Sequence, residues 1–224
     1  DKKIIENQFK EAGPSLLTLN LRDFASAVSL DCPTPGGGSV AALCAALSAS
    51  LSAMVANLTF GKKGYEEVSG EMKDAASKAQ KLKEDLLAAV DEDTRAFNKV
   101  MEAFGLPKGS EEQIKEKEAA IESATKQATL VPLGVLERCV PLLELAMLAA
   151  QKGNRNSLSD AGVAGLIGEA AAIGAFYNIK INLPGIRDDI FRGEALKKGG
   201  EVMSQVTRVG REIRALVERQ LDKT

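Results

Sequence analysis

The sequence predicts an all-α protein, an up-and-down helical bundle of long helices in a single domain over residues 1–224. Apolar residues make up 45% of the chain but aromatic residues only 4%, and a core of Ala, Leu, Val and Ile suits close helix packing. Glycine and proline gather at a few places and leave long helical runs between them. No segment of useful length shows the two-residue alternation of a strand.

The apolar spacing predicts a short helix over about residues 20–28, and two prolines exclude a helix over 31–35. Five longer helices are then expected over about residues 36–60, 66–104, 110–150, 157–182 and 188–221. Pro132 and Pro141 predict an interruption or a kink in the third of these long helices, because proline removes a helical hydrogen bond.

The helix expected over residues 36–60 lies in a segment without a charged side chain, from Cys32 to Gly61. Its length would permit a membrane span, but serine, asparagine and threonine interrupt it and most of its other residues are alanine. We therefore predict a buried central helix and no membrane partner. Its small residues would let neighbouring helices approach closely, including those of a second subunit, which predicts a dimer.

Charge and composition exclude several classes of function. The formal net charge is −2 with acids and bases mixed, so no nucleic-acid partner is expected. The chain contains no histidine, which excludes a Ser-His-Asp triad, a Cys-His pair and a His-ligated metal. Cys32, Cys44 and Cys139 fit no zinc motif, and buried free thiols in a reducing cytoplasm are the simplest interpretation.

Asp93 is the strongest candidate for proton transfer in the sequence. Its neighbours at helical spacing are apolar, whereas Asp91 shares its face with charged and polar residues. A desolvated carboxylate has a raised pKa and can exchange a proton near neutral pH. The alternative is a polar residue at the edge of the stripe, or a buried aspartate that binds the backbone or a lysine.

The turn formed by Pro35, Gly36, Gly37, Gly38 and Ser39 opens the uncharged helix. Its backbone amides, together with the helix dipole, would attract an anion or a developing negative oxygen. It lacks the lysine of a Walker loop and the spacing of a dinucleotide fingerprint. A tight turn before a helix is the alternative, although three glycines indicate that something approaches the backbone closely.

Further polar residues are weaker candidates. Lys62 and Lys63 could meet an acidic ligand tail or complement a helix C-terminus. Asp160 follows the same apolar spacing as Asp93 but lies where aspartate commonly caps a helix. The amides of Asn154, Asn178 and Asn182 could satisfy the backbone or hold a ligand.

Several motifs together resemble the cyclodeaminase/cyclohydrolase family of folate enzymes. They are Pro33–Ser39, Asn57–Thr59, Gly61–Tyr65, Asp91–Asp93 with Ala96–Phe97, Gly105–Lys108, Val131–Leu133, Gly153–Asn154 with Ser159–Ala164, and Asn178–Leu183. No single motif is decisive, but their order and spacing are specific and span nearly the whole chain. In the Gly61–Tyr65 segment Gly64 departs from the lysine common in the family, which bears little on the chemistry.

The resemblance implies a cytoplasmic all-helical homodimer with a folate cleft beside the glycine-rich turn, and chemistry without a metal or a cofactor. It assigns the catalytic aspartate to Asp93. It also implies that the turn 35–39 and the other polar candidates bind the substrate, together with one aromatic side chain on the helix of Asp93. These further substrate-binding residues are Asn57, Lys62, Lys63, Phe97, Asn154, Asp160 and Asn178.

The implied reaction is hydrolysis of 5,10-methenyltetrahydrofolate to 10-formyltetrahydrofolate, with Asp93 as general base and then as general acid. The alternative is the cyclodeaminase reaction, in which 5-formiminotetrahydrofolate gives 5,10-methenyltetrahydrofolate and ammonia. We favour the hydrolase because no formiminotransferase domain accompanies this chain and because two motifs, 33–38 and 105–108, look more like the stand-alone enzymes. A helical docking protein without enzymatic activity is a third possibility.

Overall fold

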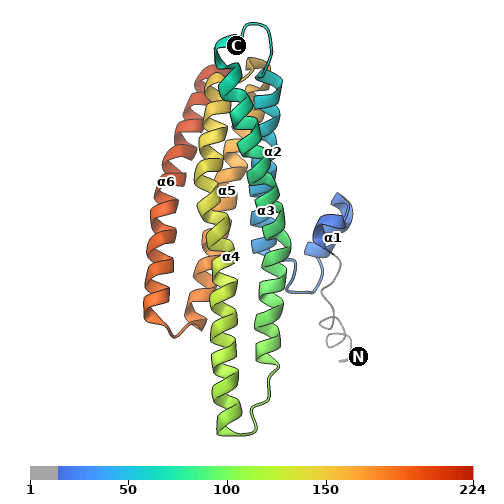
Figure 1. The fold of residues 1–224 in the computed structure, drawn as a ribbon, viewed down its shortest axis with the longest axis vertical. Coiled ribbons are helices and arrows are strands. Elements are labelled where there is room, and N and C mark those ends of the chain that lie inside the picture. Colours follow the sequence, from blue (N-terminus) through green and yellow to red (C-terminus); the bar gives the residue numbers. More distant parts are fainter. Residues whose placement is uncertain (1–14, 224) are drawn as a thin grey trace.

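The computed structural model describes residues 15–223, and every regular element in this range is helical (Figure 1). The long helices each run opposite to the one before, so the predicted up-and-down bundle is confirmed (Figure 1). The elements are η1 (Leu16–Thr18), α1 (Leu21–Val28), α2 (Gly37–Thr59), η2 (Glu66–Val68), α3 (Ser69–Phe104), α4 (Glu111–Lys152), η3 (Arg155–Ser157), α5 (Leu158–Asn182), η4 (Leu183–Gly185) and α6 (Asp189–Leu221).

The predicted interruption of α4 is wrong, because the helix continues through both of its prolines. Pro132 has no N–H, which leaves the carbonyl of Ala128 without its usual partner inside the helix. The side chain of Asn182 supplies a replacement, since its Nδ2 donates to Ala128 O at 3.1 Å. A neighbouring helix thus satisfies the group that the proline frees.

Helix α2 packs against α3, α4 and α5, and its inner face is made of small side chains. Ser48 on this face donates a hydrogen bond from Oγ to the carbonyl oxygen of Ala164 on α5, at 2.7 Å. A Cβ atom added to Gly168 of α5 would lie 2.9 Å from Ser48 Oγ, so glycine is needed for this close approach. The prediction that small residues let the central helices approach closely is confirmed.

Two helical segments have the length and hydropathy of a membrane span, Gly37–Thr59 and Arg155–Gly185. Of their most apolar stretches, 61% and 50% are buried in the bundle. The outer sides of both helices nevertheless carry exposed apolar side chains, and we call this surface the α2/α5 face. It comprises Leu47, Met54 and Leu58 of α2 and Val163, Leu166, Tyr177 and Ile181 of α5.

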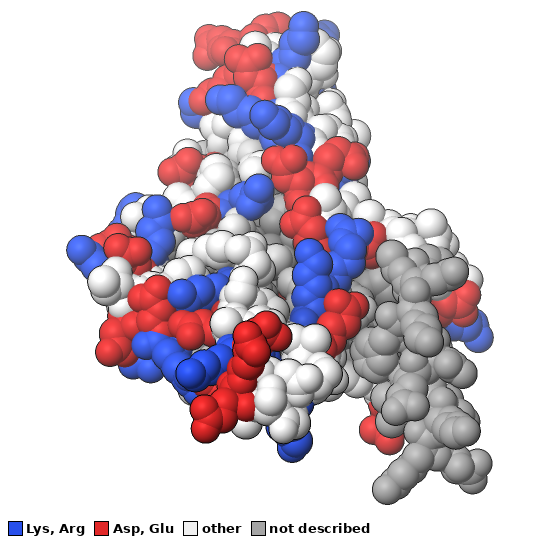
Figure 2. Space-filling model, turned by 60° about the horizontal axis from the view of Figure 1, so that its bottom comes forward, with Lys and Arg blue, Asp and Glu red and all other residues white. Residues whose placement is uncertain are grey.

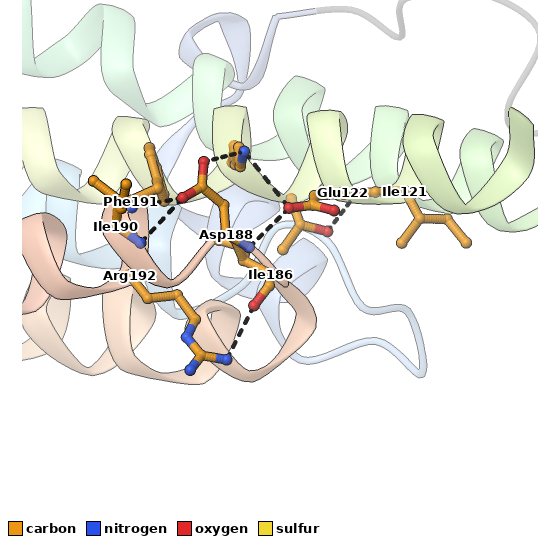
Figure 3. A network of polar contacts seen from close by, with 9 residues as sticks. Ile121, Glu122, Ile186, Asp188, Ile190, Phe191 and Arg192 are labelled. Atoms are coloured by element: carbon orange, nitrogen blue, oxygen red, sulfur yellow. Dashed lines mark hydrogen bonds and ion pairs between the residues drawn. The ribbon is translucent and has the colours of Figure 1, made fainter. Parts of the chain in front are cut away.

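Charged side chains of both signs alternate over the face drawn in Figure 2. One ordered group of them joins the turn between α5 and α6 to α4 (Figure 3). Asp188 caps α6 by accepting hydrogen bonds from the amides of Ile190 and Phe191. Its carboxylate also binds Lys126 of α4 at 2.8 Å, and its own amide donates to Glu122 at 3.0 Å. These contacts fix the start of α6 relative to α4.

All three cysteines are free thiols. Cys139 is buried, and desolvation raises the pKa of its thiol to about 12. Cys44 is half-buried, but Cys32 is exposed, so the expectation of buried thiols is wrong for this residue. Cys32 lies in the short segment between α1 and α2, outside the helices that form the core.

Candidate active site

The N-terminus of α2 has no cap from its own segment, because Gly36 stands at the N-cap position without a side chain. Asp93 of α3 takes that place. A Cβ atom on Gly38 would overlap Asp93 Oδ1 and would lie 2.6 Å from Oδ2, so the carboxylate lies directly against the Gly38 backbone. The close approach that the three glycines predicted is thus made by the candidate catalytic aspartate.

Ser39 binds the same carboxylate twice. Its backbone N–H donates to Asp93, and its Oγ lies 3.2 Å from Asp93 Oδ2 and donates to the carbonyl of Val90 at 2.8 Å. The sequence predicted Ser39 as a substrate contact, but its side chain has no exposed surface. In this structure the hydroxyl group therefore serves Asp93 and α3.

Burial raises the pKa of Asp93 above its ordinary value, and the hydrogen bonds from Ser39 lower it only in part. Asp91, two residues before Asp93, has different hydrogen-bond partners. Its oxygens accept hydrogen bonds from Ser15 Oγ at 2.5 Å and from the amide of Leu16 at 2.8 Å, which anchor η1. Asp91 thus has a structural role, while Asp93 keeps the raised proton affinity that acid–base chemistry requires.

Asn178 of α5 lies on the other side of the turn. Its Nδ2 donates to the carbonyl of Gly174 at 2.9 Å, and a Cβ atom on Gly37 would lie 3.4 Å from Nδ2 and 3.8 Å from Oδ1. Gly37 is exposed, whereas Pro35 before it is buried. The structure thus brings together parts of α2, α3 and α5 that lie far apart in the sequence. Phe97, one turn beyond Asp93 on α3, is half-buried at this end of the bundle.

The remaining predicted binding residues lie at the opposite end of α2. The helix has 23 residues, which corresponds to about 33 Å at a rise of about 1.5 Å per residue. Within one chain, these residues and Asp93 cannot contact the same end of a small molecule. The group at the far end comprises Asn57, Lys62, Lys63, Asn154 and Asp160.

Contacts at this far end are mainly structural. The amide of Asn154 donates to Thr59 Oγ1 at 2.8 Å, and its side chain accepts from the amide of Asn156 at 3.2 Å. Lys62 lies over the ring of Tyr65, 5.8 Å from its centre. Asp160 lies in the first turn of α5 but not at the N-cap position, which Ser157 occupies without a side-chain hydrogen bond.

One residue of the site was missed by the sequence reasoning. Thr94 follows Asp93 on α3, and its Oγ1 lies 3.2 Å from Ser39 Oγ. No periodicity distinguishes this threonine, because its role depends on how α2 and α3 pair. A hydroxyl residue adjacent to a candidate catalytic aspartate was the only signal that the sequence offered.

The sequence of this chain is similar to those of known proteins. Residues 20–200 match a family model described as formiminotransferase-cyclodeaminase. The chain is 40% identical over 178 residues to the methenyltetrahydrofolate cyclohydrolase of Methylorubrum extorquens, covering 80% of this chain and 86% of the relative. It is 36% identical over 193 residues to the mouse formimidoyltransferase-cyclodeaminase, covering 85% of this chain but only 36% of that protein.

A solved structure agrees with the sequence relatives. The crystal structure of formiminotetrahydrofolate cyclodeaminase from Thermotoga maritima superimposes with a TM-score of 0.83 at 31% sequence identity. The similarity covers 92% of this chain and 99% of that one. The resemblance drawn from the sequence motifs is therefore confirmed, and the chain belongs to the formiminotransferase-cyclodeaminase family.

Proposed function

We propose that this chain is a cytoplasmic enzyme of folate one-carbon metabolism that hydrolyses 5,10-methenyltetrahydrofolate to 10-formyltetrahydrofolate without a metal or a cofactor. The observation that carries the proposal is the placement of Asp93, a partly buried carboxylate of raised pKa held against Gly38 at the start of α2. The similarity to a methenyltetrahydrofolate cyclohydrolase over 86% of that enzyme's length supports the choice of reaction.

In the proposed reaction, a water oxygen bonds to the cationic methenyl carbon while Asp93 accepts one proton of the water. The bond from that carbon to N5 of the folate then breaks, and the protonated Asp93 gives its proton to N5. The remaining hydroxyl proton leaves to solvent as the formyl C=O forms on N10. One water is consumed and one proton is released, which balances the positive charge of the substrate.

The substrate would lie over the exposed part of the turn. Gly37 presents its backbone there beside Asn178, whose Oδ1 is a hydrogen-bond acceptor. Pro35 and Gly36 shape the approach to the helix, and Phe97 offers an aromatic surface one turn from Asp93. The amides and the dipole at the start of α2 would stabilise an oxygen on which negative charge develops.

The functional unit would be a homodimer, formed by two copies that cover each other's α2/α5 face. This face exposes Leu47, Leu166 and Ile181 at 50%, 49% and 75%, an apolar surface of the kind that marks an interface. In a twofold arrangement with the α2 helices antiparallel, the start of one α2 would lie beside the end of the other. The Lys62 and Lys63 pair of the second copy could then meet the acidic tail of the folate.

The cyclodeaminase reaction is the second candidate, and the structural match to a formiminotetrahydrofolate cyclodeaminase favours it. The match covers 99% of that chain at 31% sequence identity. In this reaction Asp93 would move a proton from N10 to the departing nitrogen as ammonia leaves.

Offering both substrates to the purified protein tests the proposal. Loss of methenyl absorbance without ammonia release would support the hydrolase, and ammonia release from 5-formiminotetrahydrofolate would support the cyclodeaminase. In the Asp93→Asn variant, the active reaction should slow by about 10²–10⁴-fold, the usual contribution of acid–base catalysis. The helical circular dichroism signal should be unchanged.

A fully active Asp93→Asn variant would contradict the assignment of Asp93. If a titration detected no binding of any tetrahydrofolate derivative, the docking protein without enzymatic activity would be the better interpretation.

A further inference from the structure

A chain of two hydroxyl groups leads from α3 across to α2 and back to Asp93. Thr94 Oγ1 lies 3.2 Å from Ser39 Oγ, which in turn lies 3.2 Å from Asp93 Oδ2 and 2.8 Å from Val90 O. Ser39 has no exposed surface, so solvent does not compete for its hydroxyl group. The carboxylate proposed to move the proton thus ends a short, partly buried network with Ser39 at its centre.

The Ser39 hydroxyl has one proton and two acceptors, Val90 O and Asp93 Oδ2. Donation to an ionised carboxylate is roughly twice as strong as donation to a neutral carbonyl. When Asp93 is ionised, the proton is therefore drawn toward Oδ2. When Asp93 is protonated, its own O–H can donate to Ser39 Oγ, and the Ser39 proton returns to Val90 O.

Either hydroxyl group could be the donor in the contact between Thr94 and Ser39, and the other partners of Ser39 assign this role to Thr94. The single proton of the Ser39 hydroxyl group is donated either to Val90 O or to Asp93 Oδ2. The contact between Ser39 and Thr94 at 3.2 Å therefore uses the proton of Thr94. A donor at Ser39 Oγ polarises the Ser39 O–H and strengthens its own donation to Asp93. Thr94 thereby acts on the carboxylate through Ser39 without touching a substrate.

We propose that Thr94 and Ser39 are positioning residues that set how tightly Asp93 holds its proton, with the Ser39 proton alternating between Asp93 Oδ2 and Val90 O as Asp93 ionises. The proposal rests on the proposed acid–base function of Asp93 for its relevance to catalysis. It does not depend on which of the two folate reactions the chain performs, because both need the carboxylate to accept and return a proton.

The surroundings of Asp93 favour control by hydroxyl groups over control by charge. Among residues 15–223, no charged side chain contributes to its raised pKa, which follows from desolvation and is opposed by the hydrogen bonds from Ser39. The first turns of α2 carry no charge. On α3, Asp91 is bound by Ser15, and on α4, Glu122 and Lys126 bind each other. On α5, the side chain at this site is Asn178, whose amide group carries no charge.

Carboxyl-detected ¹³C NMR on the ligand-free protein tests the proposal directly, because it follows the titration of Asp93 without any substrate. Ser39→Ala and Thr94→Val should each raise the pKa of Asp93, the first more than the second, and Thr94→Ser should restore the wild-type titration. Thr129→Val is a matched control, because Thr129 is a buried threonine whose hydroxyl bonds only to Thr125 O of its own helix. It should leave the titration of Asp93 unchanged.

The same variants give a kinetic signature. On the acidic limb of the pH profile, kcat/KM should fall about tenfold for Ser39→Ala and about threefold for Thr94→Val, because a pKa rise of one unit lowers the ionised fraction tenfold. At high pH, where Asp93 is ionised in every variant, the values should converge. A merely structural loss would lower kcat/KM equally at all pH values.

An unchanged Asp93 titration in both Ser39→Ala and Thr94→Val would overturn the proposal, as would a Thr94→Ser variant that titrates like Thr94→Val. If the titrations shift as expected but neither folate is turned over, the hydroxyl pair stands and the proposed function fails. Circular dichroism and thermal unfolding of each variant establish that the titrated protein is folded. Should Ser39→Ala not fold, Thr94→Val and Thr94→Ser alone decide the outcome.

Discussion

The two ends of α2 are completed by side chains of different kinds. At the C-terminal end, Thr59 is fully buried, donates to Val55 O at 2.6 Å and accepts from the amide of Asn154 at 2.8 Å. At the N-terminal end, no side chain of the segment caps the helix, and the carboxylate of Asp93 arrives from α3 instead. Neutral groups complete one end, while a titratable group completes the other.

This difference separates a structural helix end from a functional one. Thr59 uses its donor and its acceptor within the protein, so nothing at that position needs a ligand. Asp93 is desolvated and has no cationic partner in the part of the chain that the structure describes, and its pKa is correspondingly raised. A protein tolerates such a group where chemistry needs it, because the cost is balanced by the rest of the fold.

The largest expected effect comes from Gly38→Ala. The added methyl group would occupy the space of the Asp93 carboxylate, and a displacement of about 1 Å at a catalytic group can lower turnover about 100-fold. Gly37→Ala is the comparison variant, because its Cβ would make only ordinary contact with Asn178 at 3.4 Å and would leave Asp93 in place. Since Gly37 lies where the substrate is proposed to bind, its effect is expected in KM more than in kcat. Steady-state kinetics of the two variants should show a large loss of kcat for Gly38→Ala and a much smaller one for Gly37→Ala. Equal losses would mean that the carboxylate does not need its present position.

Thr59→Val should affect stability and leave the chemistry intact. Valine has the shape of threonine but leaves the buried amide of Asn154 without its acceptor, which costs about 1–3 kcal/mol of unfolding free energy. Urea denaturation should detect this loss, while kcat of the folded enzyme stays within about twofold of wild type. A strong loss of turnover in a stably folded variant would show that the C-terminal end takes part in the reaction.

Glycine is needed at the C-terminal end for its backbone conformation. Gly61 has a φ of 70° and no neighbour that a Cβ atom would meet. Gly61→Ala should therefore lower the unfolding free energy by about 1 kcal/mol, and Gly61→Asn by less, because asparagine tolerates this conformation. The order of the two midpoints in thermal unfolding checks the assignment. Gly61→Ala as stable as wild type would show that the left-handed conformation is not required.

The smallest expected effect is a dependence of stability on pH that belongs to the N-terminal end alone. Because the pKa of Asp93 is higher in the folded than in the unfolded protein, folding favours its protonated form. The wild type should therefore lose stability as the pH rises from the unfolded value of about 4 through the folded pKa, relative to Asp93→Asn. Unfolding free energies of both proteins across this range give the difference. A difference of opposite sign would mean that the folded protein favours the ionised carboxylate.

Much of the fold follows from local sequence signals. The glycines and prolines between helices predict their ends to within about three residues, as at 36–60 for the observed Gly37–Thr59 and at 66–104 for the observed Ser69–Phe104. The exception is Pro132, where proline chemistry alone predicts a break. The group that prevents it, Asn182, lies 54 residues from the carbonyl it binds, and no local pattern links the two.

The sequence predicted the separate segments of the site, but it did not predict which of them lie side by side. The apolar stripe around Asp93 and the glycines at 36–38 each indicate chemistry, but only the pairing of α2 with α3 shows that they meet. Thr94 was missed for the same reason. The separation of Lys62 from Asp93 follows from helix length, since about 23 residues of helix span about 33 Å.

The bond between Asn182 and the carbonyl of Ala128 also constrains the register of two helices. Helix α5 presents mainly alanine and glycine to α4, and larger side chains of α4 such as Leu143 pack against them. If α5 moved by one turn against α4, the carbonyl freed by Pro132 and the amide of Asn182 would both lose their partners. This polar contact thus favours one register of α5 against α4. The same register places Asn178 of α5 beside Gly37.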